Sequence, residues 1–444
     1  MKGISGPANI QTKQLRIAQL AKEDDKRVLT SLAYNMDVHW LYEAYVRTNK
    51  SSAPGIDGVF AKRYEGNLVE NLKDLLERAK SGSYKTPAVK RVHIPKGEGK
   101  TRPIGLPTFE DKVLQRGVQM LLEPAYEQDF LDCSYGFRPG KSQHQALDTL
   151  WKHLMKQQGE WVLSVDISGF FDNIDHKHMR HFLDRRVRDG VVRRLIDKWL
   201  RAGICENGVI RHPIKGTPQG GVLSPLLSNI YLHELVDKWF VETVTPRMTG
   251  AARMFRFADD IIMVFQSKED ADRVLEVLHK RFEKYGLDLH PEKTRLINFQ
   301  KPRQRPPSDR RPETQGNSFD FLGFTMYWRK SRKGRWVVGQ KTRKSRLKRA
   351  LGAIQEWCRL NRHRKLAEQH RMLALKMKGH YAYYGITGNS RMLGRFCWNC
   401  KFIWWKWLNR RSQHRHLSVK RFFEKLDRNP LPNPRIVHSV YQTQ

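Results

Sequence analysis

The sequence lacks the long apolar runs from which membrane-spanning helices are built. Its 444 residues contain no uninterrupted apolar stretch of about 18 residues, which excludes a transmembrane helix. Residues 1–26 also lack the apolar segment that a secretory signal would need. We therefore expect a cytoplasmic protein that does not associate with a membrane.

Cysteine is scarce as well. The chain has five cysteines, an odd number without the spacing of a disulfide framework, which fits a reducing compartment. Cys397 and Cys400 form a single CxxC pair inside a tryptophan-rich stretch. Because a structural zinc site needs about four ligands and no second pair follows, we expect two buried thiols here.

Acidic residues are few compared with basic ones. The chain has 45 Asp and Glu against 82 Lys and Arg, a net charge of +37. The imbalance is greatest in residues 301–444, where 35 basic residues face 7 acidic ones. A segment this basic indicates a polyanionic partner, most simply a nucleic acid.

The acidic residues that are present stand in unusual places. Asp259 and Asp260 separate two largely apolar runs, 254–258 and 261–265, in the pattern of a strand, a turn and a second strand. Adjacent carboxylates repel each other and gain nothing from apolar surroundings. Taken alone the pair is most simply a solvated surface turn, whereas in apolar surroundings it would need a bound cation to neutralise it.

A third acid follows another apolar strand. Asp166 comes directly after Trp161–Val165, so the three strands could bring Asp166, Asp259 and Asp260 together. Such a cluster of hard oxygen ligands is suited to two Mg²⁺ ions, which complete their coordination with substrate phosphate and water. The alternative is that Asp166 caps the helical segment that follows it.

Hydrophobic periodicity predicts an α+β fold with helices on one face of a small sheet. Helices are expected at 27–47 and 222–241, and the chain is expected to be wholly helical from Lys341, over 342–361, 363–377 and 388–411. Residues 301–316 are rich in Pro and Arg and are expected to form an exposed loop.

A series of short motifs resembles the reverse transcriptase family, and most closely the reverse transcriptase/maturases encoded by bacterial group II introns. In chain order the motifs are Gly55-Ile56-Asp57-Gly58, Ile94-Pro95-Lys96, Arg102-Pro103-Ile104-Gly105-Leu106-Pro107-Thr108, Tyr135-Gly136-Phe137-Arg138-Pro139, Asp166-Ile167, Phe170-Phe171-Asp172-Asn173-Ile174, Thr217-Pro218-Gln219-Gly220-Gly221, Phe257-Ala258-Asp259-Asp260, Pro291-Glu292-Lys293-Thr294 and Phe321-Leu322-Gly323-Phe324. Their order along the chain is that of the family. Segments 378–385, 404–411 and 431–438 resemble the maturase region and its DNA-binding tail.

The resemblance implies a right-hand polymerase fold, with fingers and a palm whose antiparallel sheet packs on helices, followed by an all-α thumb/maturase domain. The expected division is an N-terminal helical extension over 1–48, fingers over 49–160, a palm over 161–325, a thumb/maturase domain over 326–410 and a basic DNA-binding tail over 411–444. The resemblance is to the subgroup without an HNH endonuclease domain.

The resemblance also implies roles for particular residues. Asp166, Asp259 and Asp260 are the expected catalytic residues and metal ligands, together with the backbone carbonyl of Ile167. One Mg²⁺ ion (Mn²⁺ as a possible substitute) would lower the pKa of a primer 3′-hydroxyl, and the other would stabilise the leaving pyrophosphate. The family usually has Tyr where this chain has Phe257, which keeps the ring but loses the hydroxyl.

Five further residues are expected at the nucleotide. Lys96 and Arg102 flank a hairpin tip and would reach the triphosphate, although a solvated hairpin is the alternative. Phe171 would pack where a ribose 2′-hydroxyl projects, unless its neighbour Phe170 faces the pocket instead. Gln219 would approach the nucleotide or cap the following helix, and Lys293 would protonate pyrophosphate or remain a surface lysine.

The basic C-terminal part is expected to bind RNA. Six cations in one short run are expected to follow a phosphate backbone: Lys341, Arg343, Lys344, Arg346, Lys348 and Arg349. Four tryptophans at 398–407 are expected mainly in the core, with one ring possibly stacking on a base.

The function expected from the resemblance is an RNA-directed DNA polymerase that also acts as a maturase. It would bind its structured intron RNA, assist splicing and copy the RNA by target-primed reverse transcription, with a DNA primer and dNTPs. We expect a bacterial ribonucleoprotein that is cytoplasmic and nucleoid-associated when it acts on DNA, with a dimer as one of its possible states. The alternative is a related enzyme recruited by the host for defence or repair, without splicing.

Overall fold

The computed structural model describes residues 7–97, 100–156, 159–217, 220–302, 318–412 and 416–439. The chain forms two compact units. Unit 1 consists of Met1–Gln143, Leu163–Met263 and Lys268–Arg295, and unit 2 consists of His144–Val162, Val264–Ser267 and Leu296–Gln444. Each unit is therefore built from segments that are distant in the sequence.

The first part of unit 1 is helical. Its elements are α1 (Pro7–Glu23), the 3₁₀ turn η1 (Leu32–Asn35), α2 (Val38–Arg47), α3 (Ala61–Glu65), α4 (Leu68–Ser81) and α5 (Phe109–Asp129). The expected helix over 27–47 is wrong at its start. The backbone of Leu29 pairs with Val187, and α2 begins only after Asp37, whose carboxylate accepts a hydrogen bond from the backbone N–H of Trp40 at 2.8 Å.

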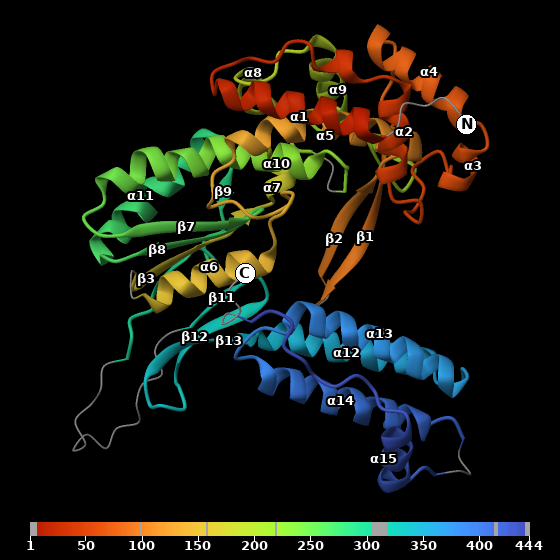
Figure 1. Cartoon of the computed structure of the whole chain (residues 1–444), viewed down its shortest axis with the longest axis vertical. Helices are drawn as coiled ribbons and strands as arrows, with labels where there is room; N and C mark the ends of the chain where they lie inside the picture. Colours follow the sequence, from red (N-terminus) through yellow and green to blue (C-terminus); the bar gives the residue numbers. More distant parts are fainter. Residues whose placement is uncertain are drawn as a thin grey trace. The chain divides into compact units, whose positions relative to one another are not determined.

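A long hairpin projects from these helices (Figure 1). Its strands β1 (Val89–Gly97) and β2 (Lys100–Leu106) are antiparallel, and β1 also pairs in parallel with β5 (Ile204–Glu206). A second, short hairpin joins β5 to β6 (Val209–Arg211), which gives the sheet order β2-β1-β5-β6. Helices α8 (His176–Asp184) and α9 (Gly190–Leu200) precede β5.

The sheet that carries the acidic residues has the order β10-β3-β8-β7. Its strands are β3 (Trp161–Val165), β7 (Ala252–Phe257), β8 (Asp260–Phe265) and β10 (Arg295–Asn298). The short strands β4 (Ile167–Ser168) and β9 (Asp288–Leu289) pair with each other. Helix α10 (Ser224–Leu232) is hydrogen-bonded to β7 through the Arg256 side chain, which donates to Asn229, and α11 (Lys268–Lys284) follows β8 in the chain.

The long helix expected over 222–241 is not a regular α-helix. α10 ends at Leu232, and the chain continues as two π-helical segments, η2 (His233–Asp237) and η3 (Trp239–Val244), followed by the 3₁₀ turn η4 (Thr245–Arg247). π-helical turns are rare and occur frequently at functional sites. Hydrophobic periodicity did not predict this change of register, because the buried apolar side chains continue through it.

Unit 2 ends in helices. It contains α6 (Gln143–Met155), the antiparallel strands β11 (Phe319–Phe321), β12 (Phe324–Lys330) and β13 (Trp336–Thr342), and then α12 (Lys344–Leu360), α13 (Leu366–Tyr384), α14 (Ser390–Leu408) and α15 (Val419–Arg428). The expectation of helix from Lys341 is wrong by a few residues, since Lys341 and Thr342 close β13. The expected all-α segment therefore begins at Lys344.

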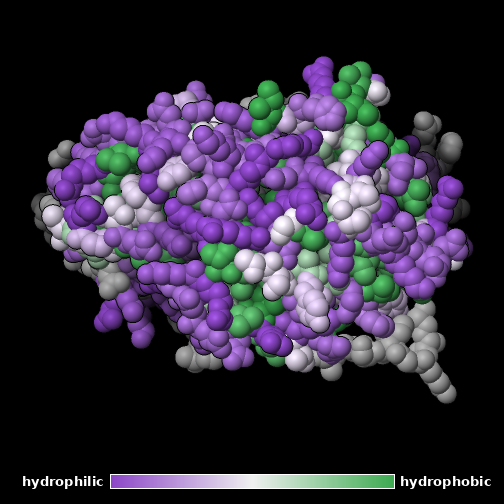
Figure 2. Space-filling model, turned by 90° about the horizontal axis from the view of Figure 1, so that it is seen from above, coloured by the Kyte–Doolittle hydropathy of each residue, from purple (hydrophilic) through white to green (hydrophobic). Residues whose placement is uncertain are grey.

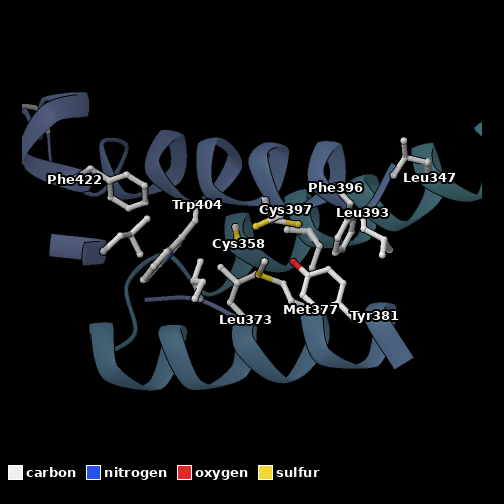
Figure 3. Packing of buried hydrophobic residues seen from close by; sticks show 14 residues of the cluster. Leu347, Cys358, Leu373, Met377, Tyr381, Leu393, Phe396, Cys397, Trp404 and Phe422 are labelled. Carbon is white, nitrogen blue, oxygen red and sulfur yellow. The ribbon is translucent and has the colours of Figure 1, made fainter. Parts of the chain in front are cut away.

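The C-terminal helices enclose a hydrophobic core of their own (Figure 3). Leu373, Met377 and Tyr381 of α13 face Leu393 and Phe396 of α14. Three thiols lie in the same core, at Cys358, Cys397 and Cys400. The two CxxC thiols are thus buried, as expected, and burial raises the pKa of Cys358 to about 12 and that of Cys400 further still.

The tryptophans near the C-terminus divide as expected between core and surface. Trp404 is buried and donates its indole N–H to Gln369 Oε1 at 3.0 Å. The ring of Trp398 is 57% exposed and stacks on Phe423. Trp405 and Trp407 are half-buried and pack against the same core, so Trp404 is the buried ring of the four and Trp398 the accessible one.

The expected fold class is confirmed, since a mixed α/β region is followed by the helices α12–α15. One face of the molecule is mostly hydrophilic, with small separated hydrophobic areas (Figure 2). Within the described ranges, no helix has both the length and the apolar character needed to cross a membrane.

Candidate active site

The three predicted catalytic acids lie at the same end of the sheet. Glu160 N–H donates to the Phe265 carbonyl at 2.9 Å, so the start of β3 lies beside the end of β8, and these neighbouring strands run antiparallel. Asp166, directly after β3, therefore lies at the same end as Asp259 and Asp260, where β8 begins. Asp166 and Asp259 are half-buried and Asp260 is exposed, so this end is open to solvent.

The backbone of Asp166 is fixed by the segment that precedes β10. Its carbonyl accepts a hydrogen bond from His290 N–H at 2.8 Å, and its N–H donates to Thr294 Oγ1 at 3.3 Å. The ammonium of Lys293 lies 3.2 Å from Asp166 Oδ1. Ile167 pairs with Leu289 and its side chain is buried, so the chain after Asp166 is anchored as well.

The acids are suited to magnesium but do not form a closed cluster. Among the residues that the structure describes, no three Asp, Glu, His or Cys side chains are gathered tightly enough to hold a metal ion alone. Magnesium is commonly bound through one or two carboxylates, with substrate phosphate and water supplying the other ligands. The open, oxygen-rich end of the sheet fits that mode, and the Lys293 ammonium is a cation already placed beside Asp166.

The turn that carries the acid pair has a constrained backbone. Ala258 adopts a left-handed conformation with φ of 56°, which costs a non-glycine residue about 1–2 kcal/mol. Gly136 lies against this turn so closely that a Cβ at that position would stand 2.3 Å from the Ala258 nitrogen. The Tyr135-Gly136-Phe137 motif therefore packs backbone to backbone on the acidic turn. The aromatic ring of Phe257 lies 6.3 Å from that of Phe137.

Burial distinguishes the two adjacent phenylalanines that follow Asp166. Phe170 is buried, whereas Phe171 is half-buried, and the two rings meet edge to face at 5.3 Å. The Phe171 carbonyl accepts a hydrogen bond from Thr217 N–H at 2.8 Å. Of the pair, Phe171 is thus the ring available to a ligand, and its backbone is tied to the start of the Thr217-Pro218-Gln219 motif.

The predicted nucleotide residues of the hairpin and of this motif are described only in part. Arg102 is exposed on β2 opposite Ile94, while the side chain of Lys96 and all of Gln219 lie outside the described residues. Gly220, with φ of 109°, is so close to β2 that an added Cβ would stand 2.5 Å from the Gly105 carbonyl oxygen. The base of the β1–β2 hairpin therefore contacts the residue that follows Gln219.

A buried carboxylate that the sequence reasoning missed supports the same region. Asp111 of α5 accepts hydrogen bonds from the Tyr84 hydroxyl, the Trp199 indole and the Gln115 amide. Gln115 Oε1 in turn accepts from the Val222 N–H at 2.8 Å. Burial raises the pKa of Asp111 to about 6 despite these donors. The signal was an acid within an otherwise apolar helix face, and its partners are distant in the sequence.

The six predicted RNA-binding cations are all exposed and lie in unit 2. Lys341 lies one residue before the end of β13, and its ammonium is 4.4 Å from the centre of the Tyr327 ring. Arg343 pairs with Asp320 at 3.0 Å. The other four, Lys344, Arg346, Lys348 and Arg349, belong to the first two turns of α12.

Comparison with known proteins shows the family to which the chain belongs. Residues 94–326 match the family model described as reverse transcriptase (RNA-dependent DNA polymerase), which covers just over half of the chain. This chain belongs to the reverse transcriptase family. It is therefore an RNA-directed DNA polymerase, and the family implies a divalent metal cofactor, a nucleic-acid template and dNTPs.

Two relatives show how far the similarity extends. The reverse transcriptase is 31% identical over 363 residues to Protein YkfC of Escherichia coli (strain K12), which covers 74% of this chain and 91% of that protein. It is 34% identical over 278 residues to the group II intron-encoded protein LtrA of Lactococcus lactis subsp. cremoris, which covers 60% of this chain and 46% of that protein. The aligned region thus spans less than half of LtrA.

The close approach of Gly136 to the acidic turn leads to a first prediction. Gly136→Ala should displace Ala258 and with it Asp259 and Asp260, lowering the rate of primer extension at least tenfold. Gly190→Ala is the control, because a Cβ there meets only an arginine side-chain nitrogen at 3.7 Å. Primer extension by both purified variants measures the effect. Equal rates would show that the turn tolerates the methyl group.

Proposed function

We propose that this reverse transcriptase binds a group II intron RNA, assists its splicing and copies the RNA by target-primed reverse transcription. The observation that carries the proposal is the combination of a polymerase site in unit 1 with a strongly basic helical segment that follows it in the chain. The similarity to a protein named as group II intron-encoded supports the intron as the RNA.

In the proposed site Asp166, Asp259 and the Ile167 carbonyl would hold two Mg²⁺ ions, with Asp260 on the side of the primer 3′-hydroxyl. Bound metal would supply neutralisation of phosphate charge and a lowered pKa for the attacking hydroxyl. Mn²⁺ offers the same oxygen-binding chemistry and is a possible substitute.

The protein's own side chains would supply proton donation, sugar selection and triphosphate binding. Phosphoryl transfer depends on positioning and charge more than on a protein nucleophile. Lys293 would leave Asp166 and donate a proton to the departing pyrophosphate, for which its exposed ammonium is accessible. Phe171 would lie against the sugar and exclude a 2′-hydroxyl, while Arg102, Lys96 and Gln219 would bind the triphosphate and the base-paired nucleotide.

A second candidate function is a host-recruited reverse transcriptase in defence or repair, without splicing. The similarity that spans 91% of YkfC, a protein whose name mentions no intron, favours keeping it. Both candidates share the polymerase site. They differ in whether α12 and its neighbours bind intron RNA.

The metal assignment is tested by Asp259→Ala. Because the half-buried Asp259 lies at the end of the sheet that is open to solvent, the variant should fold and yet lose about 100- to 1,000-fold in extension of a DNA primer on an RNA template with Mg²⁺, the order of magnitude typical for loss of one charge-stabilising group. Asp288→Ala, an exposed acid of β9, is the matched control and should keep its activity. Synthesis retained by Asp259→Ala would refute the assignment.

Sugar selection is tested by Phe171→Ala. Removing the half-buried ring should leave room for a 2′-hydroxyl and raise the ratio of ribonucleotide to deoxynucleotide incorporation about tenfold or more. Single-nucleotide extension with each rNTP and dNTP pair gives that ratio. An unchanged ratio would mean that another group selects the sugar.

RNA binding by α12 is tested with a triple alanine variant of Lys344, Lys348 and Arg349. Loss of three phosphate contacts should reduce the slope of log K against log salt by about two to three for a group II intron RNA. The control replaces Lys268, Lys280 and Lys284, three exposed cations of α11, and should keep the slope. If wild-type protein binds no group II intron RNA at physiological salt, the splicing role is excluded and the second candidate stands.

A further inference from the structure

A fully buried arginine lies behind the acidic turn. Arg256 of β7 stands three residues before Asp259, and its side chain has no exposed surface. All five of its N–H groups have acceptors. Nε donates to Asp237 Oδ1 at 2.7 Å, Nη1 donates to Asn229 Oδ1 at 2.9 Å and to the Ala258 carbonyl at 3.2 Å, and Nη2 donates to Ser134 Oγ at 2.7 Å and to Asp237 Oδ2.

Stability alone is a poor explanation for this arrangement. Replacing a buried ion pair by apolar side chains of similar volume is often neutral or stabilising, because two charges must be taken out of water. Arg256 and Asp237 are both fully withdrawn from solvent, and the buried polar side chains around them include Asn229, Ser134 and His233. What a fully bonded guanidinium supplies, and an apolar side chain does not, is fixed direction.

The acceptors come from three separate segments. Asn229 and Asp237 belong to the α10–η2 helix, Ser134 belongs to the segment that contains Gly136, and Ala258 belongs to the acidic turn itself. Backbone bonds strengthen the link, since Arg256 N–H donates to the Cys133 carbonyl at 2.7 Å and Tyr135 N–H donates to the Arg256 carbonyl at 2.8 Å.

Asn229 closes the network on its other side. While its Oδ1 accepts from Arg256, its Nδ2 donates to the Gly136 carbonyl at 2.7 Å. Gly136 is the residue whose backbone touches Ala258. The left-handed Ala258 is therefore held on its carbonyl side by Arg256 and on its nitrogen side by Gly136, which is how a strained backbone persists in a folded protein.

The π-helical segment explains how one helix supplies two of the acceptors. At 3.6 residues per turn, the eight steps from Asn229 to Asp237 would rotate by about 800° and leave the two side chains about 80° apart. A π turn contains more residues than an α turn. Because η2 occupies five of these eight steps, the rotation per residue falls and both side chains reach the same guanidinium.

We propose that Arg256 is a positioning residue, which acts with Asn229 and Asp237 to hold Asp259 and Asp260 in the geometry that binds divalent metal. This inference rests on the proposed role of Asp259 as a metal ligand. The network touches no substrate and acts through the backbone of the 258–260 turn. Loss of this network should therefore weaken metal binding more than nucleotide binding.

The test uses Asn229→Ala, which breaks the link to Gly136 and leaves the Arg256–Asp237 pair in place. Arg256→Lys is a second variant, because it keeps the charge but has too few donors for all the acceptors. Tyr231→Phe is the matched control, since it removes a different buried hydrogen bond of the same helix, from the Tyr231 hydroxyl to the Tyr285 carbonyl.

Two quantities separate positioning from simple loss of stability. The Mg²⁺ concentration at half-maximal extension should rise about tenfold in Asn229→Ala and Arg256→Lys, while the KM for dNTP at saturating Mg²⁺ stays within twofold. Mn²⁺ binding to the enzyme with primer–template, followed by electron paramagnetic resonance, should weaken in parallel without reference to activity. Tyr231→Phe should match wild type in both, even where its melting temperature falls as far.

Each outcome decides between the two claims. If Asp259→Ala binds Mn²⁺ as wild type does, the metal assignment fails and this inference fails with it. If Asp259→Ala loses the ion while Asn229→Ala and Arg256→Lys keep wild-type Mn²⁺ affinity and Mg²⁺ dependence, the inference alone is overturned. Should one of the two variants not fold, the other carries the same readouts.

Discussion

A single ion pair with no access to water, Arg256 with Asp237, constrains the centre of unit 1. Truncating one partner of such a pair leaves a buried charge uncompensated, at a cost of about 3–5 kcal/mol. The strand β7, the helix α10–η2 and the segment 133–136 must therefore meet in one arrangement. The acidic turn of a reverse transcriptase follows β7 directly, so the meeting point of β7, α10–η2 and segment 133–136 determines where this turn lies.

The nucleotide side of the site depends on contacts of a different kind. There the chain relies on close backbone approach, with Gly220 against Gly105 and Thr217 bonded to the Phe171 carbonyl. The buried Asp111 holds Gln115, and Gln115 holds the Val222 N–H. Main-chain contacts thus join the Phe171 backbone to Thr217 and the base of the β1–β2 hairpin to Gly220, while the side chains of Asp111 and Gln115 hold the chain at Val222.

The part of this site that could be predicted from sequence is the part in which chemistry shows locally. Carboxylates inside apolar strands indicated Asp166, Asp259 and Asp260 before any resemblance was considered, and the structure brings them to one end of a sheet. Family resemblance was confirmed for the polymerase. Burial then separated Phe170 from Phe171, which sequence alone left open.

What sequence could not supply were features that depend on long-range partners. The change of register after Leu232 leaves no periodic signal, since apolar residues line both kinds of turn. Arg256 reads as an ordinary basic residue in a strand until Asp237, Asn229 and Ser134 are seen around it. The expected helix over 27–47 was wrong because Leu29 pairs with a strand-like segment more than 150 residues away.

The thiols of the C-terminal core have a consequence for the protein's redox chemistry. Oxidants and alkylating agents attack the thiolate, and burial keeps Cys358 and Cys400 in the protonated form at neutral pH. In the folded protein these sulfurs are therefore slow to be oxidised, first to sulfenic and then to sulfinic and sulfonic acid. Their reactivity thus measures how often this helical core, to which α15 also contributes, opens enough to bring these sulfurs to solvent.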